Sequence, residues 1–323
     1  MRVIALLLAM TIAAWPAGPA MAQTPSDKSY RLAVLGVSEW SLRNTRDMTL
    51  PALAAKAFVE GRNLVVDSQS ASPADMPDLA RRMIASKPQV IVAIGGDALR
   101  AARAATGLVP IVSFGPDRVA LGVGHSLARP GGHVTGIVIL GAELDAKRLH
   151  LLHEAMPELR RIAGLGRTEA PGYETSMTEM RAVATAAGFE LALVDAAGPG
   201  GYEAAFATLS QHRMQALVIA ADPILFRDVA PLMALANAAR LPAACQWREM
   251  AEAGCLLAYG PNLRTLRARL ADYVAKILRG ANPGDLPIEQ PTTFELAVNL
   301  KAAKALGLTI AESFLVRADE VIE

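Results

Sequence analysis

The sequence predicts an α/β protein made of two similar halves, each built on a parallel sheet. Short apolar segments alternate with segments whose apolar residues recur at helical spacing. Such short apolar runs are typical of parallel strands that are buried on both faces. A length of 323 residues, more than one hydrophobic core normally organises, also indicates two units. Three strand-like runs recur in order between 127 and 132 residues later: residues 31–36 at 161–166, 90–94 at 217–221, and 110–114 at 242–246.

Helices are predicted between these strands. Residues 76–84 carry apolar side chains at helical spacing, and Pro88 ends that helix before the next strand. Residues 263–278 carry a second apolar stripe, and Gly280 closes the helix. Alternating strands and helices predict right-handed crossovers in each half. The basic residues of the second helix are expected on its solvated surface: Arg264, Arg267, Arg269, Lys276 and Arg279.

The composition excludes several classes of protein. The chain has 32 Lys and Arg against 31 Asp and Glu, so it lacks the positive excess that displaces counterions from nucleic acid. Hydrophobic residues make up 52% of the chain, which is too many for a disordered protein. Two cysteines are too few for a disulfide scaffold or a four-thiolate zinc site. We therefore expect a soluble globular protein that binds something small.

Residues 1–22 have the pattern of a secretory signal peptide. Arg2 precedes a short apolar stretch, and Ala20-Met21-Ala22 is the small-x-small pattern of signal peptidase, so cleavage is expected after Ala22. The apolar stretch is shorter than the roughly 20 residues that a membrane-spanning helix needs. Pro16 disfavours the alternative of a buried N-terminal helix. The sequence therefore predicts an exported protein.

The candidate binding site lies in the loops that follow the apolar strands, because ligands of α/β proteins bind beyond the carboxyl ends of parallel strands. Each loop alone could be an ordinary turn, and each tryptophan could be core packing. Loops from both halves together would line a cleft, in which Thr168 and backbone amides hold a carboxylate and Asp222 or Glu249 accepts an ammonium group. The candidate ligand-binding residues are Trp40, Gly96, Asp97, Asp117, Thr168, Asp222, Trp247, Glu249, Tyr259 and Asn262.

Common enzyme and cofactor motifs are missing from the sequence. It has no Gly-x-Ser-x-Gly elbow and no phosphate-binding Gly-x-x-x-x-Gly-Lys-Ser/Thr loop. Gly122-Val123-Gly124 lacks the third glycine of a dinucleotide site. His150 and His153 could hold a metal from one helix, but a third ligand would have to come from elsewhere, and an ordinary structural role is favoured. No catalytic residue, metal or cofactor is expected.

Cys245 and Cys255 leave two alternatives open. In an oxidising compartment they could pair and close a small loop. They could also remain two buried apolar thiols, since cysteine packs well in strands.

Six segments, in order along the chain, resemble the ABC-transporter substrate-binding proteins related to the tryptophan/tyrosine-type binding components. Residues 58–64 (FVEGRNL) are similar to the family's "GYVEGRNL" stretch, and residues 126–136 (SLARPGGHVTG) to its "SLARPGGNVTG" segment. The other similar segments are residues 147–149, 259–262, 285–292 and 301–308. The resemblance extends over nearly the whole chain after residue 22.

The resemblance implies a type I periplasmic binding protein fold. Such a fold has two Rossmann-like lobes with parallel sheets, joined by a hinge of three crossings. The crossings are expected near residues 138–142, 259–263 and 285–292. Each lobe is then discontinuous: the first comprises residues 23–139 and 263–287, and the second residues 140–262 and 288–323.

The implied activity is capture of a small organic solute, such as an amino acid or an aromatic compound, in the inter-lobe cleft. A monomeric periplasmic protein would close on the solute by hinge motion and deliver it to an ABC permease in the inner membrane, without chemistry. The alternative is an exported ligand-sensing protein or an enzyme that kept the two-lobe fold, because fold alone does not decide function.

Overall fold

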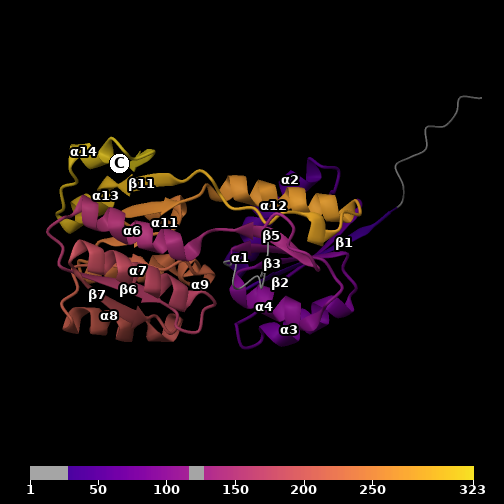
Figure 1. The fold of residues 1–323 in the computed structure, drawn as a ribbon, viewed down its shortest axis with the longest axis horizontal. Coiled ribbons are helices and arrows are strands. Elements are labelled where there is room, and N and C mark those ends of the chain that lie inside the picture. The colour runs from indigo at the N-terminus through magenta and orange to yellow at the C-terminus, as the bar shows by residue number, and fades with distance from the viewer. Residues whose placement is uncertain (1–27, 116–126) are drawn as a thin grey trace, which may run out of the picture.

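Two α/β lobes lie side by side in the computed structural model, which describes residues 28–115 and 127–323 (Figure 1). The predicted signal peptide, residues 1–22, and the candidate residue Asp117 lie outside these described residues. Each lobe is built on one sheet, of five strands in the first and seven in the second. None of the described helices is long and apolar enough to cross a membrane.

The first sheet is entirely parallel, with the strand order β2-β1-β3-β4-β5. Its strands are β1 (Tyr30–Gly36), β2 (Leu64–Ser70), β3 (Val90–Ile94), β4 (Ile111–Gly115) and β5 (Val134–Val138). Every side chain of β3 is buried, as expected for a central strand that helices cover on both faces.

Helices cover both faces of this first sheet. One face packs against α3 (Met76–Ala85) and α4 (Gly96–Ala105). The other packs against α1 (Glu39–Asn44), α2 (Leu50–Ala54) and α12, with the π-helical turn η1 (Thr45–Thr49) between α1 and α2. Helix α12 (Leu263–Leu278) comes from much later in the chain, and Figure 1 shows it in orange lying on the first lobe.

The second sheet has the order β12-β11-β10-β9-β8-β6-β7 and is mostly parallel. Its one antiparallel pair is β10 with β11. Strand β10 leads out of the second lobe and β11 leads back into it, so the two run in opposite directions. The prediction of parallel sheets is confirmed apart from this pair. The strands are β6 (Arg161–Gly166), β7 (Glu190–Asp195), β8 (Ala216–Ile219), β9 (Ala243–Cys245), β10 (Leu257–Gly260), β11 (Glu295–Asn299) and β12 (Glu320–Ile322).

Helices also cover both faces of the second sheet. Helices α6 and α7 pack on one face, and α8 and α10 on the other. The helices of this lobe are α6 (Gly141–Ala155), α7 (Tyr173–Ala187), α8 (Tyr202–Gln211), α9 (Pro223–Arg227), α10 (Val229–Ala238), α11 (Arg248–Glu252), α13 (Leu300–Leu306) and α14 (Glu312–Leu315), and the short 3₁₀ turn η2 (Pro199–Gly201) precedes α8. A second 3₁₀ turn, η3 (Pro283–Asp285), follows α12 and contacts β5 of the first lobe.

The internal repeat in the sequence corresponds to equivalent strands. The order β2-β1-β3-β4-β5 in the first sheet matches β7-β6-β8-β9-β10 in the second. The three recurring apolar runs are therefore the pairs β1 and β6, β3 and β8, and β4 and β9. The two halves have the same core topology, as the sequence predicts.

The chain passes between the lobes three times: from β5 to α6, from β10 to α12, and from η3 to β11. Backbone and side-chain hydrogen bonds hold these crossings together. The amide of Val138 donates to the carbonyl of Glu289 at 2.9 Å, and Nδ2 of Asn262 donates to Oε1 of Glu295 at 3.0 Å. The three segments therefore form one hinge. The exact lobe boundaries given above stay a prediction.

Cys245 and Cys255 form a disulfide, which resolves the alternative left open by the sequence. Cys245 ends β9, and Cys255 lies between α11 and β10, with 6.2 Å between their Cα atoms. Both residues are fully buried. The bridge joins the end of β9 to the residue before Leu256 and so constrains the segment between them, which carries Gln246 and Trp247.

Loss of this disulfide should destabilise the protein. The bridge closes a short loop, for which the chain-entropy model gives about 3 kcal/mol. We expect the Cys245→Ala/Cys255→Ala variant to lose about this free energy of unfolding in urea denaturation. A reductant should lower the stability of the wild type by a similar amount and leave the double variant unchanged. Two free thiols in denatured, unreduced wild-type protein would contradict the bridge.

Candidate functional site

A cleft between the two lobes is the candidate site. It contains about 970 Å³ of space not occupied by protein atoms, part of it open to solvent. Its walls come from loops and helix starts at the carboxyl ends of β3, β4, β6, β8 and β9. This is the edge of each sheet where the sequence places a ligand, and the duplicated topology turns the two edges toward each other.

The lobes touch each other at one side of the cleft through glycines. Gly95 and Gly96 follow β3 in the first lobe. A Cβ on Gly95 would lie 2.9 Å from Cγ of Pro223, and one on Gly96 would lie 2.7 Å from Cβ of Pro171, and both prolines belong to the second lobe. Only residues without a side chain allow this approach. The structure therefore has the lobes closed on one another.

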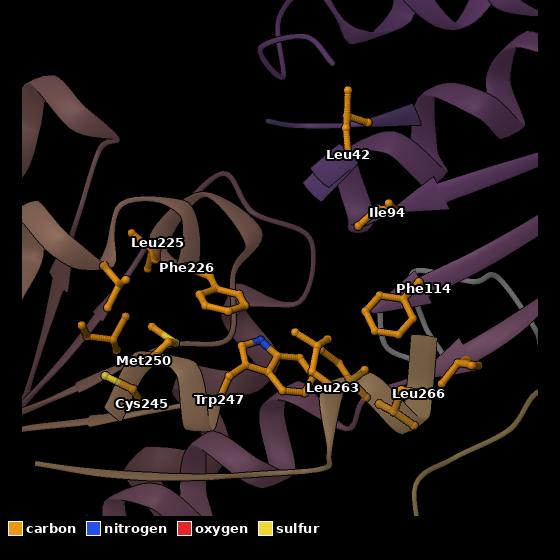
Figure 2. Close-up of a cluster of buried hydrophobic side chains, with 14 of the residues drawn as sticks. Leu42, Ile94, Phe114, Leu225, Phe226, Cys245, Trp247, Met250, Leu263 and Leu266 are labelled. Carbon is orange, nitrogen blue, oxygen red and sulfur yellow. The ribbon is translucent and has the colours of Figure 1, made fainter. Parts of the chain in front are cut away.

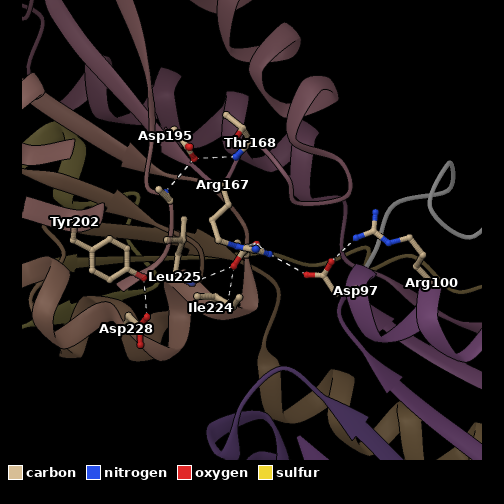
Figure 3. A network of polar contacts seen from close by, with 11 residues as sticks. Asp97, Arg100, Arg167, Thr168, Asp195, Tyr202, Ile224, Leu225 and Asp228 are labelled. Atoms are coloured by element: carbon tan, nitrogen blue, oxygen red, sulfur yellow. Dashed lines mark hydrogen bonds and ion pairs between the residues drawn. The ribbon is translucent and has the colours of Figure 1, made fainter. Parts of the chain in front are cut away.

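Arg167 joins the two lobes electrostatically (Figure 3). It follows β6, and its Nε and Nη2 donate to Oδ2 of Asp222 in the same lobe at 3.0 and 2.9 Å. Its Nη2 also donates across the cleft to Oδ2 of Asp97 at 3.0 Å. Burial lowers the pKa of Arg167, but the two carboxylates, Asp222 first, outweigh this effect and raise it. Arg167 is thus held in its charged form between the lobes.

Both aspartates that contact Arg167 have further partners. Oδ1 of Asp222 accepts from the backbone amides of Ile224 and Leu225 at 2.7 and 3.2 Å and so caps α9. Oδ1 of Asp97, in the first turn of α4, accepts from Arg100 at 2.7 Å. Each carboxylate therefore has both of its oxygens engaged.

A third carboxylate, Asp145 of α6, lies fully buried in the cleft wall. It forms an ion pair with Arg148, accepts a hydrogen bond from the hydroxyl of Ser176, and accepts from the amide of Ala221 at 3.1 Å. Burial raises the pKa of Asp145 and lowers that of Arg148, and their attraction opposes both shifts. Arg148 also donates to the carbonyl of Tyr259 at 2.7 Å, so this group ties α6 to β10.

Aromatic side chains form much of the cleft surface. The rings of Trp40 from the first lobe and Phe226 from the second lie 3.8 Å apart between centroids, and Trp247 lies 6.2 Å from Phe226. Figure 2 shows Phe114 of the first lobe on the opposite side, with Phe226 and Trp247 facing it from the second lobe. The Trp40 and Phe226 rings are in direct contact, and Phe114, Phe226 and Trp247 give the remaining space flat apolar walls.

Arg267 contacts Phe114 in this aromatic region. It is 1% exposed, lines the cleft, and has its guanidinium carbon 4.1 Å from the centre of the Phe114 ring. Within the described part of the chain, its Nε and Nη1 have no hydrogen-bond partner and it forms no ion pair. Burial lowers the pKa of Arg267 to about 9, so it stays protonated at neutral pH. The prediction that this arginine lies on the solvated surface is wrong, whereas Arg264 and Arg269 are exposed.

Five of the ten candidate residues meet at the cleft. Trp40, Gly96 and Asp97 line it from the first lobe, and Asp222 and Trp247 from the second. Asp117 lies outside the described residues.

The four remaining candidates lie elsewhere. Thr168 lines a neighbouring hollow, where its amide donates to Asp195 at 3.1 Å. Glu249 lies in α11, outside the cleft lining, and burial raises its pKa. The ring of Tyr259 stacks on Phe294 at 5.8 Å, and Asn262 caps α12 within the hinge.

The candidate residues named from the sequence did not include the cleft residues Phe114, Arg167, Phe226, Gln246 and Arg267, although the loop that begins at Arg167 was expected at the cleft. A signal existed for Arg267, because it lies four residues after Leu263 and three before Leu270, within the apolar stripe of its helix. No sequence pattern indicates that Phe226 reaches Trp40, since 186 positions separate them.

The two histidines considered as metal ligands, His150 and His153, contact other side chains. His150 lies 3.8 Å from Glu154 on the surface of α6, and the ring of His153 packs against Phe189 at 4.8 Å. Across residues 28–115 and 127–323, no three His, Cys, Asp or Glu side chains gather as a metal site would require.

Comparison with known proteins identifies the family. A family model described as "ABC transporter substrate binding protein" matches residues 32–322. No curated protein matches the chain. Among solved structures, a conserved domain protein from Vibrio cholerae is 27% identical, with a TM-score of 0.85 over 91% of this chain and 100% of that one.

Two further structures share the fold at lower identity. A Streptococcus pneumonia ABC domain in complex with L-Trp is 21% identical, with a TM-score of 0.83 over 91% of this chain and 100% of that one. A ligand-free, open substrate-binding protein from Clostridium difficile is 22% identical, with a TM-score of 0.63 over 91% and 99% of the two chains. The family match spans nearly all of the described residues and confirms the resemblance of the six sequence segments. The chain therefore belongs to the family of ABC transporter substrate-binding proteins.

Proposed function

We propose that this protein is the periplasmic component of an ABC importer, which captures a small organic solute between its lobes and delivers it to an inner-membrane permease. Membership of the family supports the binding role, and the signal-peptide pattern of residues 1–22 supports export. The observation that carries the proposal is the cleft, which lies between two lobes joined by a hinge of three crossings. Solute binding and lobe closure, rather than catalysis, are its activity.

Closure of the lobes is the conformational step that we assign to binding. Arg167 is anchored on Asp222 in the second lobe and reaches Asp97 only when the lobes are together. Gly95 and Gly96 meet prolines of the second lobe in the same arrangement. A solute that contacts both walls favours the closed form and shifts the population toward it. The closed pair of lobes then presents one defined outer surface to the permease.

The cleft residues have distinct proposed roles. Trp40 and Trp247 contact the apolar body of the solute, and Gly96 allows the close approach of the lobes. Asp97 and Asp222 act through Arg167 and do not contact the solute, because all their oxygens are already engaged. The Streptococcus pneumonia structure in complex with L-Trp supports an aromatic solute in a cleft of this fold.

A thermal-shift screen tests solute binding directly. Amino acids, aromatic acids, sugars and nucleosides are added to the purified mature protein one at a time. A true ligand at 100 times its dissociation constant adds about 2.7 kcal/mol of stability, which raises Tm by several degrees. The absence of any shift across these compounds, together with turnover of one of them, would contradict the transport role.

The contact between Arg167 and Asp97 should stabilise the closed form. Asp97→Asn removes the charge and keeps the side-chain shape. A hydrogen bond between charged groups contributes about 1.5 kcal/mol, or roughly tenfold in the closed-to-open ratio. We expect the variant to have a larger radius of gyration in solution scattering and roughly tenfold weaker affinity for the solute found by the screen.

Asp78→Asn is the matched control, because it removes an exposed ion pair with Arg81 in the same lobe. The control should keep the wild-type radius of gyration and affinity. Equal behaviour of the two variants would show that Arg167 and Asp97 do not hold the lobes together.

A further inference from the structure

Hydrogen-bond donors without partners converge on the cleft from both lobes. Arg267 of α12 contributes Nε and Nη1, and Gln246, which follows β9, contributes Nε2. Both side chains are more than nine-tenths buried and line the same space. A buried donor left without an acceptor costs about 1–3 kcal/mol, and more when it is charged. The fully buried side-chain atoms without a partner in the described cleft lining are thus donors, and an acceptor group of the solute would satisfy them.

The charges of the cleft lead to the same requirement. The three acidic side chains of its described lining each have a cationic partner: Asp97 with Arg100, Asp222 with Arg167, and Asp145 with Arg148. Arg267 is left over as a buried positive charge without a counter-charge among the described residues. The Phe114 ring offsets part of the cost of burying this charge, and an anion that pairs with it would offset more. The closed cleft therefore suits an anion.

A positively charged solute group finds no equivalent partner. Both oxygens of Asp97, Asp145 and Asp222 already accept hydrogen bonds from protein groups. Burial of an ammonium group without a free carboxylate costs several kcal/mol. The roles expected from the sequence, with Asp222 or Glu249 holding an ammonium, do not fit these contacts, since Asp222 is engaged and Glu249 lies outside the lining.

We infer that the solute is an aromatic carboxylic acid without an ammonium group, whose carboxylate pairs with Arg267 and accepts a hydrogen bond from Gln246. This inference rests on the proposed function. The guanidinium over Phe114 places the carboxylate beside the aromatic region, and Trp247 and Phe226 contact the ring of the acid. Because Arg267 belongs to the first lobe and Gln246 to the second, the carboxylate itself bridges the lobes.

Isothermal titration calorimetry with matched compounds tests the inference. Benzoate, phenylacetate and indole-3-acetate are compared with their neutral primary amides and with L-phenylalanine and L-tryptophan. We expect at least one acid to bind, at least 30-fold more tightly than its amide and than either amino acid. Tighter binding of an amide or an amino acid than of every acid would overturn the inference.

Variants of Arg267 test the ion pair. Arg267→Met should weaken binding of the best acid at least 100-fold, whereas Arg267→Lys should keep part of the affinity because it keeps the charge. Gln246→Leu should weaken binding about tenfold. Arg264→Met, an exposed residue on the same helix, is the control and should bind as the wild type does. Wild-type affinity in Arg267→Met would overturn the inference.

Stability of the ligand-free protein separates a binding role from a structural one. Removing a buried charge that has no partner should leave Tm of Arg267→Met unchanged or raise it. A structural role for Arg267 predicts a lower Tm together with unchanged acid binding in the folded fraction, which would also overturn the inference.

The two proposals fail in different ways. If sugars or amino acids bind and the acids do not, the inference is wrong and the solute-binding role stands. If no compound of the wider thermal-shift screen binds and one of them is turned over, the proposed function fails along with the inference.

Discussion

The contact of Arg167 with Asp97 is the interaction on which the rest of the cleft depends. It joins two lobes whose buried hydrophobic side chains also meet at the cleft, where Trp40 of the first lobe contacts Phe226 of the second. Burial removes water from Arg267 and strengthens every charge interaction inside. The close approach in turn requires Gly95 and Gly96, because a side chain at either position would hold the lobes apart. Closure of the lobes, burial of the cleft side chains and selectivity for the solute therefore depend on one another.

The duplicated topology explains why a cleft forms between the lobes. Equivalent strands in the two sheets end at the facing edges, so the loops that follow them become the two walls. The second crossing carries α12 onto the first lobe, where its residues Leu263 and Arg267 line the cleft. The wall of the first lobe therefore includes a segment that the later half of the chain supplies.

Much of this fold could be predicted from the sequence, because strands and helices follow from local patterns. The recurring apolar runs identified β1 and β6, β3 and β8, and β4 and β9 as equivalent strands. The sequence also predicted that these loops lie at the ends of strands. It did not predict where their side chains point: Asn262 lies in the hinge and Asp97 lines the cleft. Such directions depend on contacts such as that of Trp40 with Phe226, which couple residues far apart in sequence. Arg267 shows the converse, because helical geometry alone places it on the buried stripe.

A buried cation without a protein partner also determines how the hinge responds to a solute. In the closed form Nε and Nη1 of Arg267 are buried and have no acceptor among the described residues. The ligand-free closed form is thus destabilised by an unpaired charge, while the contact of Arg167 with Asp97 favours it. These two effects oppose each other, so the equilibrium between open and closed lobes is sensitive to the one group that pairs with Arg267. An anion of the right shape removes the penalty, and a neutral molecule of the same shape does not. Selectivity then arises from the free energy of closing as well as from the contacts made by the bound solute.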